Sequence, residues 1–385
     1  MKIAFCIPDM IIGGVEAVLL RTLNELLDTV KENPKYAGAE ICVITHAQIT
    51  EPLYSQWFKQ HPEVKLYTFY PLQNYFESMI AYTDFVFVRQ VRKLIFSLYK
   101  KCRRLSFRNK FSDIDVFIDY KNCSFFKELR DYKTRKITWI HGSIGYLQDN
   151  NIDNRLPMYD NIVGLTDDFV SDFKKIFPDL ADRVVRVYNP IDINFIRNLS
   201  KDAPRTSGKY FCHVSRLESL QKDVRTLIAA FNEFYLDNGL PDIKLLIVGD
   251  GPQIKELKKM VSLLPSSNNI VFTGLARNPF GYMENALANI LSSKSEGLPT
   301  VLVESMALGV LCIASNCKYG PHEILQDGKS GVLFEVGNVK QLAQIMSDVY
   351  NGKIDVSSIT QSATESLERF SPKVINKQIM DLLWK

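Results

Sequence analysis

The chain alternates short apolar runs with segments whose apolar residues recur at helical spacing, and it does so in two successive series. The first series starts with an apolar run at 2–7, passes through a Gly13-Gly14 pair, and enters a helical pattern that reaches Val30. Further apolar runs of strand length lie at 41–45, 64–69, 115–119, 136–140 and 161–165. Strands that alternate with helices form mostly parallel sheets with helices on both faces, so we expect a doubly wound α/β domain.

The second series follows a polar stretch at 200–209. Its predicted strands are 210–214, 244–248, 270–273, 288–291, 311–314 and 331–334, and its predicted helices are 224–236, 253–263, 280–286, 301–308 and 339–350. A length of 385 residues is too great for one ordinary domain and suits two. We therefore place a boundary near 189–192, and we expect ligands at the carboxyl ends of the strands, where doubly wound sheets bind them.

Bulk composition excludes several classes of protein. The net charge of +4 is too small for a chain whose whole surface binds polyanions, and no nucleic-acid-binding motif is present, so nucleic acid is not an expected partner. No stretch approaches about 18 uninterrupted apolar residues, and the first residues lack the features of a signal peptide. The seven cysteines form no CxxC pair, and no Asp-x-Asp pair follows an apolar strand. We expect a cytoplasmic enzyme without a metal site.

Two glutamates bracket a Gly-Leu-Pro turn in the second series. Glu296 precedes the turn, and Glu304 lies about one helical turn beyond it. Pro299 suits a helix start and Thr300 is a capping type, so free amides there form an anion site that the helix dipole strengthens. Carboxylates accept hydrogen bonds from ligand hydroxyls. Phosphate-binding amides between two such carboxylates indicate a sugar nucleotide.

The two glutamates, with seven residues between them, resemble the paired-glutamate motif of glycosyltransferase family 4, whose members are retaining enzymes of the GT-B fold. The loop that carries Arg216 and Lys222, directly after a predicted strand, resembles the Arg…Lys pair of that family. The resemblance covers nearly the whole chain and is strongest from 210 to 334. It implies a GT-B fold of two doubly wound Rossmann-like domains facing a cleft. The implied parts are an acceptor-binding domain at 1–190, a nucleotide-sugar-binding domain at 191–370, and a C-terminal helix at 371–385 that returns to the first domain.

The resemblance also implies a role for each residue that the family places against the donor. Arg216 and Lys222 would hold the diphosphate, because a leaving group that gains negative charge needs cations when no metal supplies them. Glu296 would contact hydroxyls of the donor sugar and stabilise an oxocarbenium-like state. A two-carboxylate hydrolase is the rival chemistry, but it has no use for the cation pair. The remaining contacts would be Gly249 beside the nucleotide, Arg277 in the loop that reads the base, Leu298 against the sugar, the amides of Thr300 and Val301 at the phosphates, and Glu304 at the ribose hydroxyls.

Two motifs of the first domain complete the implied site. The Gly13-Gly14 loop resembles the family's glycine loop, which lets a helix N-terminus approach the donor phosphate and the acceptor. His141 follows the predicted strand at 136–140 and resembles the family's strand-end histidine, placed near the donor sugar. We therefore group His141 with Glu296, Arg216 and Lys222 as the catalytic candidates.

A basic segment in the first domain contains no acidic residue from Phe85 to Ser112. Its apolar residues recur close to helical spacing between basic ones, which are Arg89, Arg92, Lys93, Lys100, Lys101, Arg103, Arg104, Arg108 and Lys110. A basic amphipathic helix suits an anionic membrane surface, where each basic side chain contributes about 1 kcal/mol. We interpret 89–110 as a contact with the inner face of the cell membrane. The alternative is a domain helix whose apolar stripe packs on the sheet.

Together these features predict a metal-independent, retaining glycosyltransferase without a cofactor. It would move a hexose or N-acetylhexosamine from a nucleotide sugar, expected to be UDP-linked, to a surface polysaccharide or glycolipid such as lipopolysaccharide or capsule. Two alternatives stay open: a GDP-mannose-dependent mannosyltransferase, and a catalytically silent sugar-nucleotide-binding partner protein at the membrane.

Overall fold

The structure is a computed structural model that describes residues 1–11, 13–83, 85–203, 206–217, 219–239 and 241–384. The predicted linker at 200–209 therefore lies partly outside the described residues. The chain divides into two units, which we describe separately. Unit 1 consists of Met1–Gly164, Val170–Val187 and Gln378–Lys385, and unit 2 consists of Leu165–Phe169 and Tyr188–Lys377. The domain limits predicted from the sequence, 1–190, 191–370 and 371–385, remain predictions.

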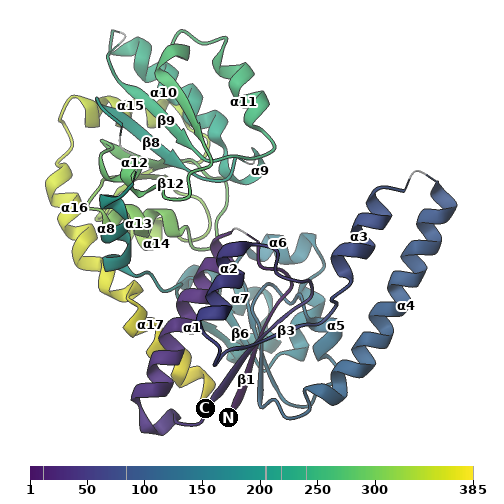
Figure 1. Cartoon of the computed structure of the whole chain (residues 1–385). Helices are drawn as coiled ribbons and strands as arrows, with labels where there is room; N and C mark the ends of the chain where they lie inside the picture. Colours follow the sequence, from purple (N-terminus) through teal and green to yellow (C-terminus); the bar gives the residue numbers. More distant parts are fainter. Residues whose placement is uncertain (12, 84, 204–205, 218, 240, 385) are drawn as a thin grey trace. The chain divides into compact units, whose positions relative to one another are not determined.

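Unit 1 is built on a seven-stranded parallel sheet in the order β3-β2-β1-β4-β5-β6-β7 (Figure 1). The strands are β1 (Lys2–Ile7), β2 (Glu40–Thr45), β3 (Lys65–Thr68), β4 (Val116–Asp119), β5 (Arg135–Trp139), β6 (Asn161–Gly164) and β7 (Val184–Arg186). Strands β2 and β3 lie on one side of β1, and strands β4 to β7 lie on its other side. The strand order therefore reverses between β1 and β4. In doubly wound sheets this switch point opens a crevice beyond the strands' carboxyl ends.

The connections of unit 1 are mostly helical. Its α-helices are α1 (Gly14–Glu32), α2 (Pro52–Gln60), α3 (Gln73–Ala81), α4 (Val86–Lys110), α5 (Phe126–Leu129) and α6 (Ile144–Asp149), and its 3₁₀ helices are η1 (Pro34–Tyr36), η2 (Asp153–Met158) and η3 (Pro178–Arg183). Two further helices, α7 (Asp167–Ile176) and α17 (Pro372–Leu383), run across the limits between the units.

Unit 2 repeats the plan with a six-stranded parallel sheet in the order β10-β9-β8-β11-β12-β13. The strands are β8 (Tyr210–Val214), β9 (Lys244–Val248), β10 (Ile270–Gly274), β11 (Ala288–Leu291), β12 (Cys312–Ser315) and β13 (Val332–Phe334). The helices are α8 (Ile193–Lys201), α9 (Ser219–Lys222), α10 (Val224–Asp237), α11 (Ile254–Val261), α12 (Phe280–Glu284), α13 (Thr300–Ala307), α14 (Pro321–Ile324), α15 (Val339–Tyr350) and α16 (Val356–Glu365), with η4 (Ser267–Asn269), η5 (Gln326–Gly328) and η6 (Ser366–Phe370). Buried apolar side chains from α10, α15 and the strands form one core.

The predicted α/β class, with two doubly wound parallel sheets, is confirmed. Each predicted strand is present, within a residue or two of its predicted ends. Among the elements that the prediction did not list are β7, an edge strand of three residues, and α16, whose sequence is rich in Ser and Thr. Neither segment carries enough apolar residues to show a clear period.

Helices α3 and α4 form a hairpin that projects from the sheet of unit 1 (Figure 1). Phe76 of α3 stacks on Phe96 of α4 with ring centroids 5.0 Å apart. Arg92 donates to the carbonyl of Met79 at 2.7 Å. Of the 25 residues of α4 only Phe107 is buried. The other residues face solvent, α3 or the segment after β3, where Arg103 Nε donates to the Phe69 carbonyl at 2.9 Å. Within the described residues, no helix is long and apolar enough to cross a membrane.

Candidate active site

An ion pair between a partly buried lysine and a buried glutamate lies beyond the carboxyl ends of β8 and β11 in unit 2. The Lys222 Nζ lies 2.6 Å from Glu296 Oε1, and Ser293 Oγ donates to the same oxygen at 2.6 Å. Gln221 Nε2 lies 3.4 Å from Glu296 Oε2. Glu296 is only 6% exposed, so its charge depends on these donors. Two predicted catalytic residues, 74 positions apart, are thus brought into direct contact.

Backbone hydrogen bonds hold the loops that carry this pair. The Lys294 amide donates to the Gln221 carbonyl at 2.7 Å, which ties the loop after β11 to α9. The Glu296 amide donates to the Lys318 carbonyl at 2.8 Å, which ties it to the loop after β12. Ser292 Oγ also donates to the Lys222 carbonyl at 3.1 Å. Because three loops share these bonds, the positions of both charges are fixed before any ligand arrives.

The Gly-Leu-Pro turn requires a glycine on the neighbouring loop. At Gly320 the backbone has a φ of +94°, and a Cβ there would lie 2.7 Å from Pro299 Cδ and 2.9 Å from the Gly297 carbonyl oxygen. A side chain at this position would therefore push the turn away from its place. Gly320 keeps the turn, and the helix start that follows it, seated against the loop after β12.

Helix α13 starts where the sequence indicated, but with a different cap. Pro299 is the N-cap residue and supplies no side-chain hydrogen bond, and Thr300 is the first helical residue. The prediction that Thr300 caps the helix is therefore wrong, because the chain enters the helix one residue earlier. The first amides of a helix have no intrahelical acceptor, so those of Thr300 and Val301 suit an anion. Glu304 lies one turn further along and is partly buried.

Close backbone contacts join the loops after β8, β9 and β10. A Cβ at Gly249, whose φ is +139°, would lie 1.9 Å from the Ser215 carbonyl oxygen. The Gly249 amide donates to the Gly274 carbonyl at 2.9 Å. Only glycine at position 249 lets the loop after β9 come this close to the loop after β8, so backbone packing explains the glycine in this turn. Arg216 and Arg277, on the loops that follow β8 and β10, are both exposed.

His213 is a residue of this region that the sequence analysis missed. Its side chain is fully buried at the end of β8, with Nδ1 2.7 Å from the Ile290 carbonyl oxygen and Nε2 2.7 Å from Ser215 Oγ. Burial lowers the pKa of His213 to about 4, so the ring is neutral near pH 7. A neutral ring that donates from Nδ1 to a carbonyl accepts at Nε2 from the serine hydroxyl. His213 thereby fixes the start of the loop that carries Arg216; a histidine inside an apolar strand was the available signal.

His141 lies in unit 1, directly after β5. Its amide donates to Asn122 Oδ1 at 2.8 Å, and its Nε2 lies 2.9 Å from the Tyr120 carbonyl oxygen. Burial lowers the pKa of His141 to about 4. The neutral ring donates from Nε2 to that carbonyl and presents Nδ1 as an acceptor. Such a ring can orient a hydroxyl group, and it does not supply a proton at pH 7.

The glycine loop of unit 1 borders a second ion cluster, whose central carboxylate, Glu16, is buried. Gly13 is the N-cap of α1, and a Cβ there would lie 2.5 Å from Glu16 Oε2, whereas Gly14 has open space around it. Lys121, just after β4, lies 2.8 Å from both Glu16 and Asp9. Burial opposes its charge, but the hydrogen bonds to both carboxylates raise the pKa of Lys121. The cluster sits at the switch point between β1 and β4, and sequence reasoning missed Lys121 because its partners are distant in the chain.

The predicted site residues therefore form two groups. His141, Gly13 and Gly14 belong to unit 1, and Arg216, Lys222, Gly249, Arg277 and the segment from Glu296 to Glu304 belong to unit 2. Each group lies at the carboxyl ends of its own sheet's strands, which is where doubly wound domains bind ligands. Among the described residues, no cluster of three or more His, Cys, Asp or Glu side chains could hold a metal ion.

Comparison with known proteins connects unit 2 to a family. Residues 195–366 match the model of the family Glycosyl transferases group 1. An uncharacterized glycosyltransferase of Methanocaldococcus jannaschii is 32% identical over 154 residues, which are 39% of this chain and 36% of that protein. An N-acetyl-D-galactosaminyltransferase of Campylobacter jejuni, whose name gives a PP-undecaprenol acceptor, is 26% identical over 100% of this chain and 98% of its own length. The chain spans 36%, 24% and 48% of the lengths of three relatives, the first of which is the Methanocaldococcus jannaschii protein.

Solved structures share the fold along the whole chain. The Anabaena protein HepE, in complex with UDP and glucose, superimposes with a TM-score of 0.76 at 19% identity, covering 100% of both chains. The fold is the GT-B fold of glycosyltransferases, as predicted. Together with the family match, the comparisons support a GT-B glycosyltransferase.

Proposed function

We propose that this protein is a metal-independent, retaining glycosyltransferase of family 4 that uses a UDP-sugar donor. The observation that carries the proposal is the Lys222–Glu296 pair, 2.6 Å long and held by Ser293, at the strand ends of the unit that matches the family model. A hydrolase with two carboxylates needs no lysine paired with one of them.

The pair suggests how the unit handles charge during transfer. When the glycosidic bond breaks, negative charge grows on the departing diphosphate, and the ammonium of Lys222 with the exposed guanidinium of Arg216 would neutralise it. Until then Glu296 compensates Lys222 and holds it in place. With a donor bound, the same carboxylate would accept hydrogen bonds from sugar hydroxyls and favour positive charge at the anomeric carbon. The amides at the start of α13 would hold the phosphates, and Glu304 the ribose.

Similar proteins favour the donor and acceptor classes. The HepE structure contains UDP and glucose, and the Campylobacter jejuni relative acts on a lipid-linked glycan by its name. We infer a hexose or N-acetylhexosamine donor and a surface polysaccharide or glycolipid acceptor. A GDP-mannose-dependent mannosyltransferase is the alternative enzyme, and a silent sugar-nucleotide-binding partner protein is the alternative without catalysis.

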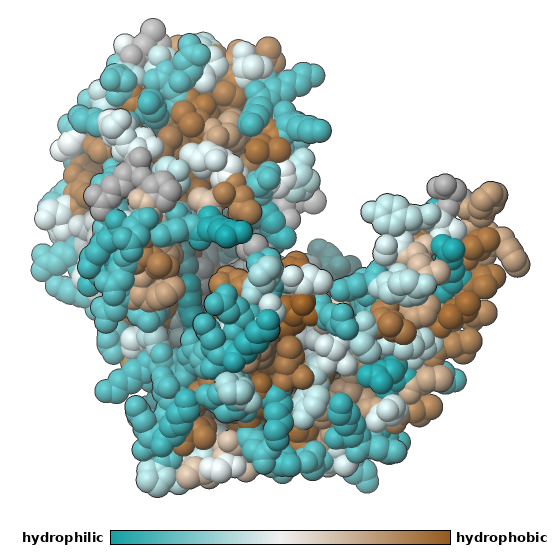
Figure 2. Space-filling view, viewed as in Figure 1, coloured by the Kyte–Doolittle hydropathy of each residue, from teal (hydrophilic) through white to brown (hydrophobic). Residues whose placement is uncertain are grey.

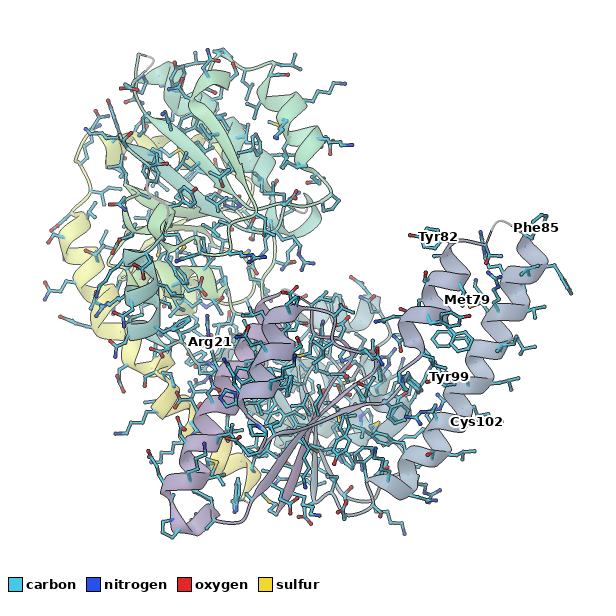
Figure 3. All side chains as sticks on the ribbon, viewed as in Figure 1. Arg21, Met79, Tyr82, Phe85, Tyr99 and Cys102 are labelled. Atoms are coloured by element: carbon cyan, nitrogen blue, oxygen red, sulfur yellow. The ribbon has the colours of Figure 1, made fainter. Side chains whose placement is uncertain are left out.

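The α4 helix supports a peripheral position on the inner membrane face. Figure 2 shows an apolar strip along the outer side of this helix. The strip is formed by exposed side chains at helical spacing, namely Phe87, Val91, Leu94, Ile95, Leu98 and Leu105. Tyr82 and Phe85 lie at the tip of the hairpin, 86% and 77% exposed (Figure 3). An apolar face beside basic residues, with no protein packed on it, fits the interface of an anionic bilayer.

The test is slow hydrolysis of a panel of nucleotide sugars, measured with and without EDTA. We expect turnover of one UDP-sugar, unchanged by the chelator. Turnover of GDP-mannose alone would favour the alternative enzyme, loss of turnover in EDTA would contradict metal independence, and inactivity with every donor, together with donor binding, would favour the silent partner. The anomeric configuration of the first transfer product, read by NMR, tests retention.

A further inference from the structure

Unit 1 contains a pocket of about 430 Å³ that neither predicted site uses. This volume falls within the range of roughly 300–1,000 Å³ that is typical of small-molecule sites. Its wall combines α4 with the segments that follow β2, β3 and β4, and with η2. The pocket therefore lies at the carboxyl edge of the sheet, where doubly wound domains bind ligands.

Cations dominate the lining of this pocket. Five basic side chains contribute to it: Lys93, Lys100, Arg104, Lys127 and Arg155. Across the part of the chain that the structure describes, none of the five forms an ion pair with a carboxylate. The excess of positive charge is therefore left for a ligand.

The one carboxylate of the lining already has partners. Glu128 is buried, accepts a hydrogen bond from the Tyr70 hydroxyl at 2.6 Å, and lies 3.6 Å from Nε2 of His46. Burial would raise the pKa of Glu128, but the His46 ring and the Tyr70 hydroxyl outweigh it and lower the value. Glu128 consequently anchors the pocket wall and leaves the five cations uncompensated.

Aromatic rings hold two of the cations in place. The Lys100 ammonium lies 4.1 Å from the centre of the Phe96 ring and 5.3 Å from that of Tyr70. The Arg155 guanidinium lies 4.6 Å from the centre of the Phe126 ring. Cation–π contacts of this kind orient a charge without neutralising it. The pocket is thus preorganised for an anion with several acceptor oxygens.

We propose that this pocket binds the phosphate groups of the acceptor, as a phosphomonoester or diphosphate. A carboxylate carries one charge, whereas a phosphomonoester carries about −1.5 to −2 and three acceptor oxygens, which matches five cations better. The apolar strip of α4 lies on the same helix as Lys93, Lys100 and Arg104 but on another face, so the vesicle experiment below tests whether the phosphate comes from a bilayer. The inference rests on the proposed function, whose acceptor it describes.

The experiment is calorimetric titration of the full chain with inorganic pyrophosphate in the absence of sugar nucleotide. All proteins carry Arg216→Gln and Lys222→Gln, which remove the cations predicted to hold the donor diphosphate. The test pair Lys100→Gln/Arg104→Gln alters the pocket, and the matched pair Lys101→Gln/Arg108→Gln removes the same charge from exposed positions of α4 outside it. We expect the test pair to weaken binding by at least about tenfold and the matched pair by less than about twofold, because only the former loses charge-assisted hydrogen bonds.

Two results would overturn the proposal that this pocket binds phosphate. One is the absence of pyrophosphate binding at millimolar concentration by a chain that keeps its thermal unfolding transition. The other is equal weakening by both pairs, which would indicate diffuse charge in place of a site. Transfer is measured separately with the wild-type chain: if that chain transfers no sugar while the titrated variants bind pyrophosphate in the pocket, the proposed function alone is contradicted.

A second arm separates a lipid source of the phosphate from a soluble one. Vesicles of phosphatidylcholine contain either phosphatidic acid, which has a phosphomonoester, or phosphatidylglycerol, which does not. A preference for phosphatidic acid that the test pair abolishes identifies a membrane headgroup. Equal binding to both vesicles, with pyrophosphate affinity still sensitive to the test pair, identifies a water-soluble phosphorylated acceptor. Either result supports the pocket.

Discussion

The two units place positive charge in opposite ways. In unit 2 the partly buried Lys222 pairs with the buried Glu296 at 2.6 Å, and hydrogen bonds among three loops fix the pair. In the pocket of unit 1, Lys100 and Arg155 lie against aromatic rings, and neither forms an ion pair with a carboxylate among the described residues. A paired charge can be positioned to within a fraction of an ångström, which catalysis needs. An unpaired charge keeps its full attraction for an incoming anion, which binding needs.

The difference also indicates what a ligand must do in each place. A diphosphate entering unit 2 must share Lys222 with Glu296, so its attraction to Lys222 is weak in the ground state. The attraction strengthens as negative charge grows on the diphosphate in the transition state. A phosphate entering the pocket of unit 1 meets cations that form no ion pair with any described carboxylate. The first arrangement favours turnover, and the second favours retention of the acceptor.

The largest effect is expected when the paired charge of unit 2 is removed. Lys222→Ala should lower kcat about 10²–10³-fold, because one preorganised group that stabilises transition-state charge contributes about 2.7–4 kcal/mol. It also leaves Glu296 buried without its cation. Steady-state assays of transfer check the result. Lys259→Ala, an exposed lysine of α11, is the control and should keep wild-type rates; a Lys222→Ala enzyme as active as this control would refute the assignment.

A smaller effect is expected at Glu304, which is proposed to bind the donor in its ground state. Glu304→Ala should weaken UDP-sugar binding about 10–100-fold, since hydrogen bonds to a charged group contribute about 1.5–3 kcal/mol. The affinity of Glu304→Gln, which keeps one acceptor oxygen, should lie between that of the wild type and that of Glu304→Ala. Isothermal titration with the donor measures both. Unchanged affinity of the alanine variant would show that the ribose is held elsewhere.

The sequence predicted unit 2 better than unit 1, and the reason is local. Arg216, Lys222 and the Glu296–Glu304 segment are loop motifs directly after apolar strands, so their context is visible in the chain. The Lys222–Glu296 contact itself was not predicted, because it depends on how the loops after β8 and β11 approach each other. Similarly, Lys121 with Glu16, and Lys100 with Tyr70, become neighbours only through strand order. The hydrophobic period fixes which segments form strands, but it does not determine which strands are adjacent.

Backbone packing at the strand ends of unit 2 can be tested through stability. Gly249→Ala should lower the free energy of unfolding by about 2–3 kcal/mol, because the Cβ would overlap the Ser215 carbonyl oxygen and the φ of +139° is unfavourable for alanine. Gly337→Ala separates the two causes, since Gly337 also has a positive φ, +76°, but open space around it. This control should lose only about 1 kcal/mol. Equal losses in urea unfolding would mean that the loops tolerate the added methyl group.

Both units contain a buried neutral histidine, and acid should therefore destabilise both. The pKa values of His141 and His213 are lowered to about 4, below the ordinary value of 6.5. The unfolded chain binds these protons first, so this contribution to stability is complete above pH 6.5 and falls as the pH drops from 6.5 towards 4. Each histidine contributes a slope of up to about 1.4 kcal/mol per pH unit. Urea unfolding between pH 7 and 4.5 should show a shallower slope for His213→Gln than for the wild type; an identical slope would show that His213 is protonated in the fold.

The smallest effect concerns one exposed cation of α4 outside the pocket. Lys101→Gln should weaken binding to vesicles of anionic lipid by about 1 kcal/mol, roughly fivefold, at low ionic strength, and by less at high salt, where the surface potential is screened. Lys59→Gln removes the same charge from α2 and serves as the control. Co-sedimentation with phosphatidylglycerol vesicles measures both. If the two variants bind equally well, the attraction arises from the net charge of the chain and not from the face of α4; if only Lys101→Gln is weaker while pyrophosphate affinity is intact, the membrane face and the phosphate pocket are separate functions of one helix.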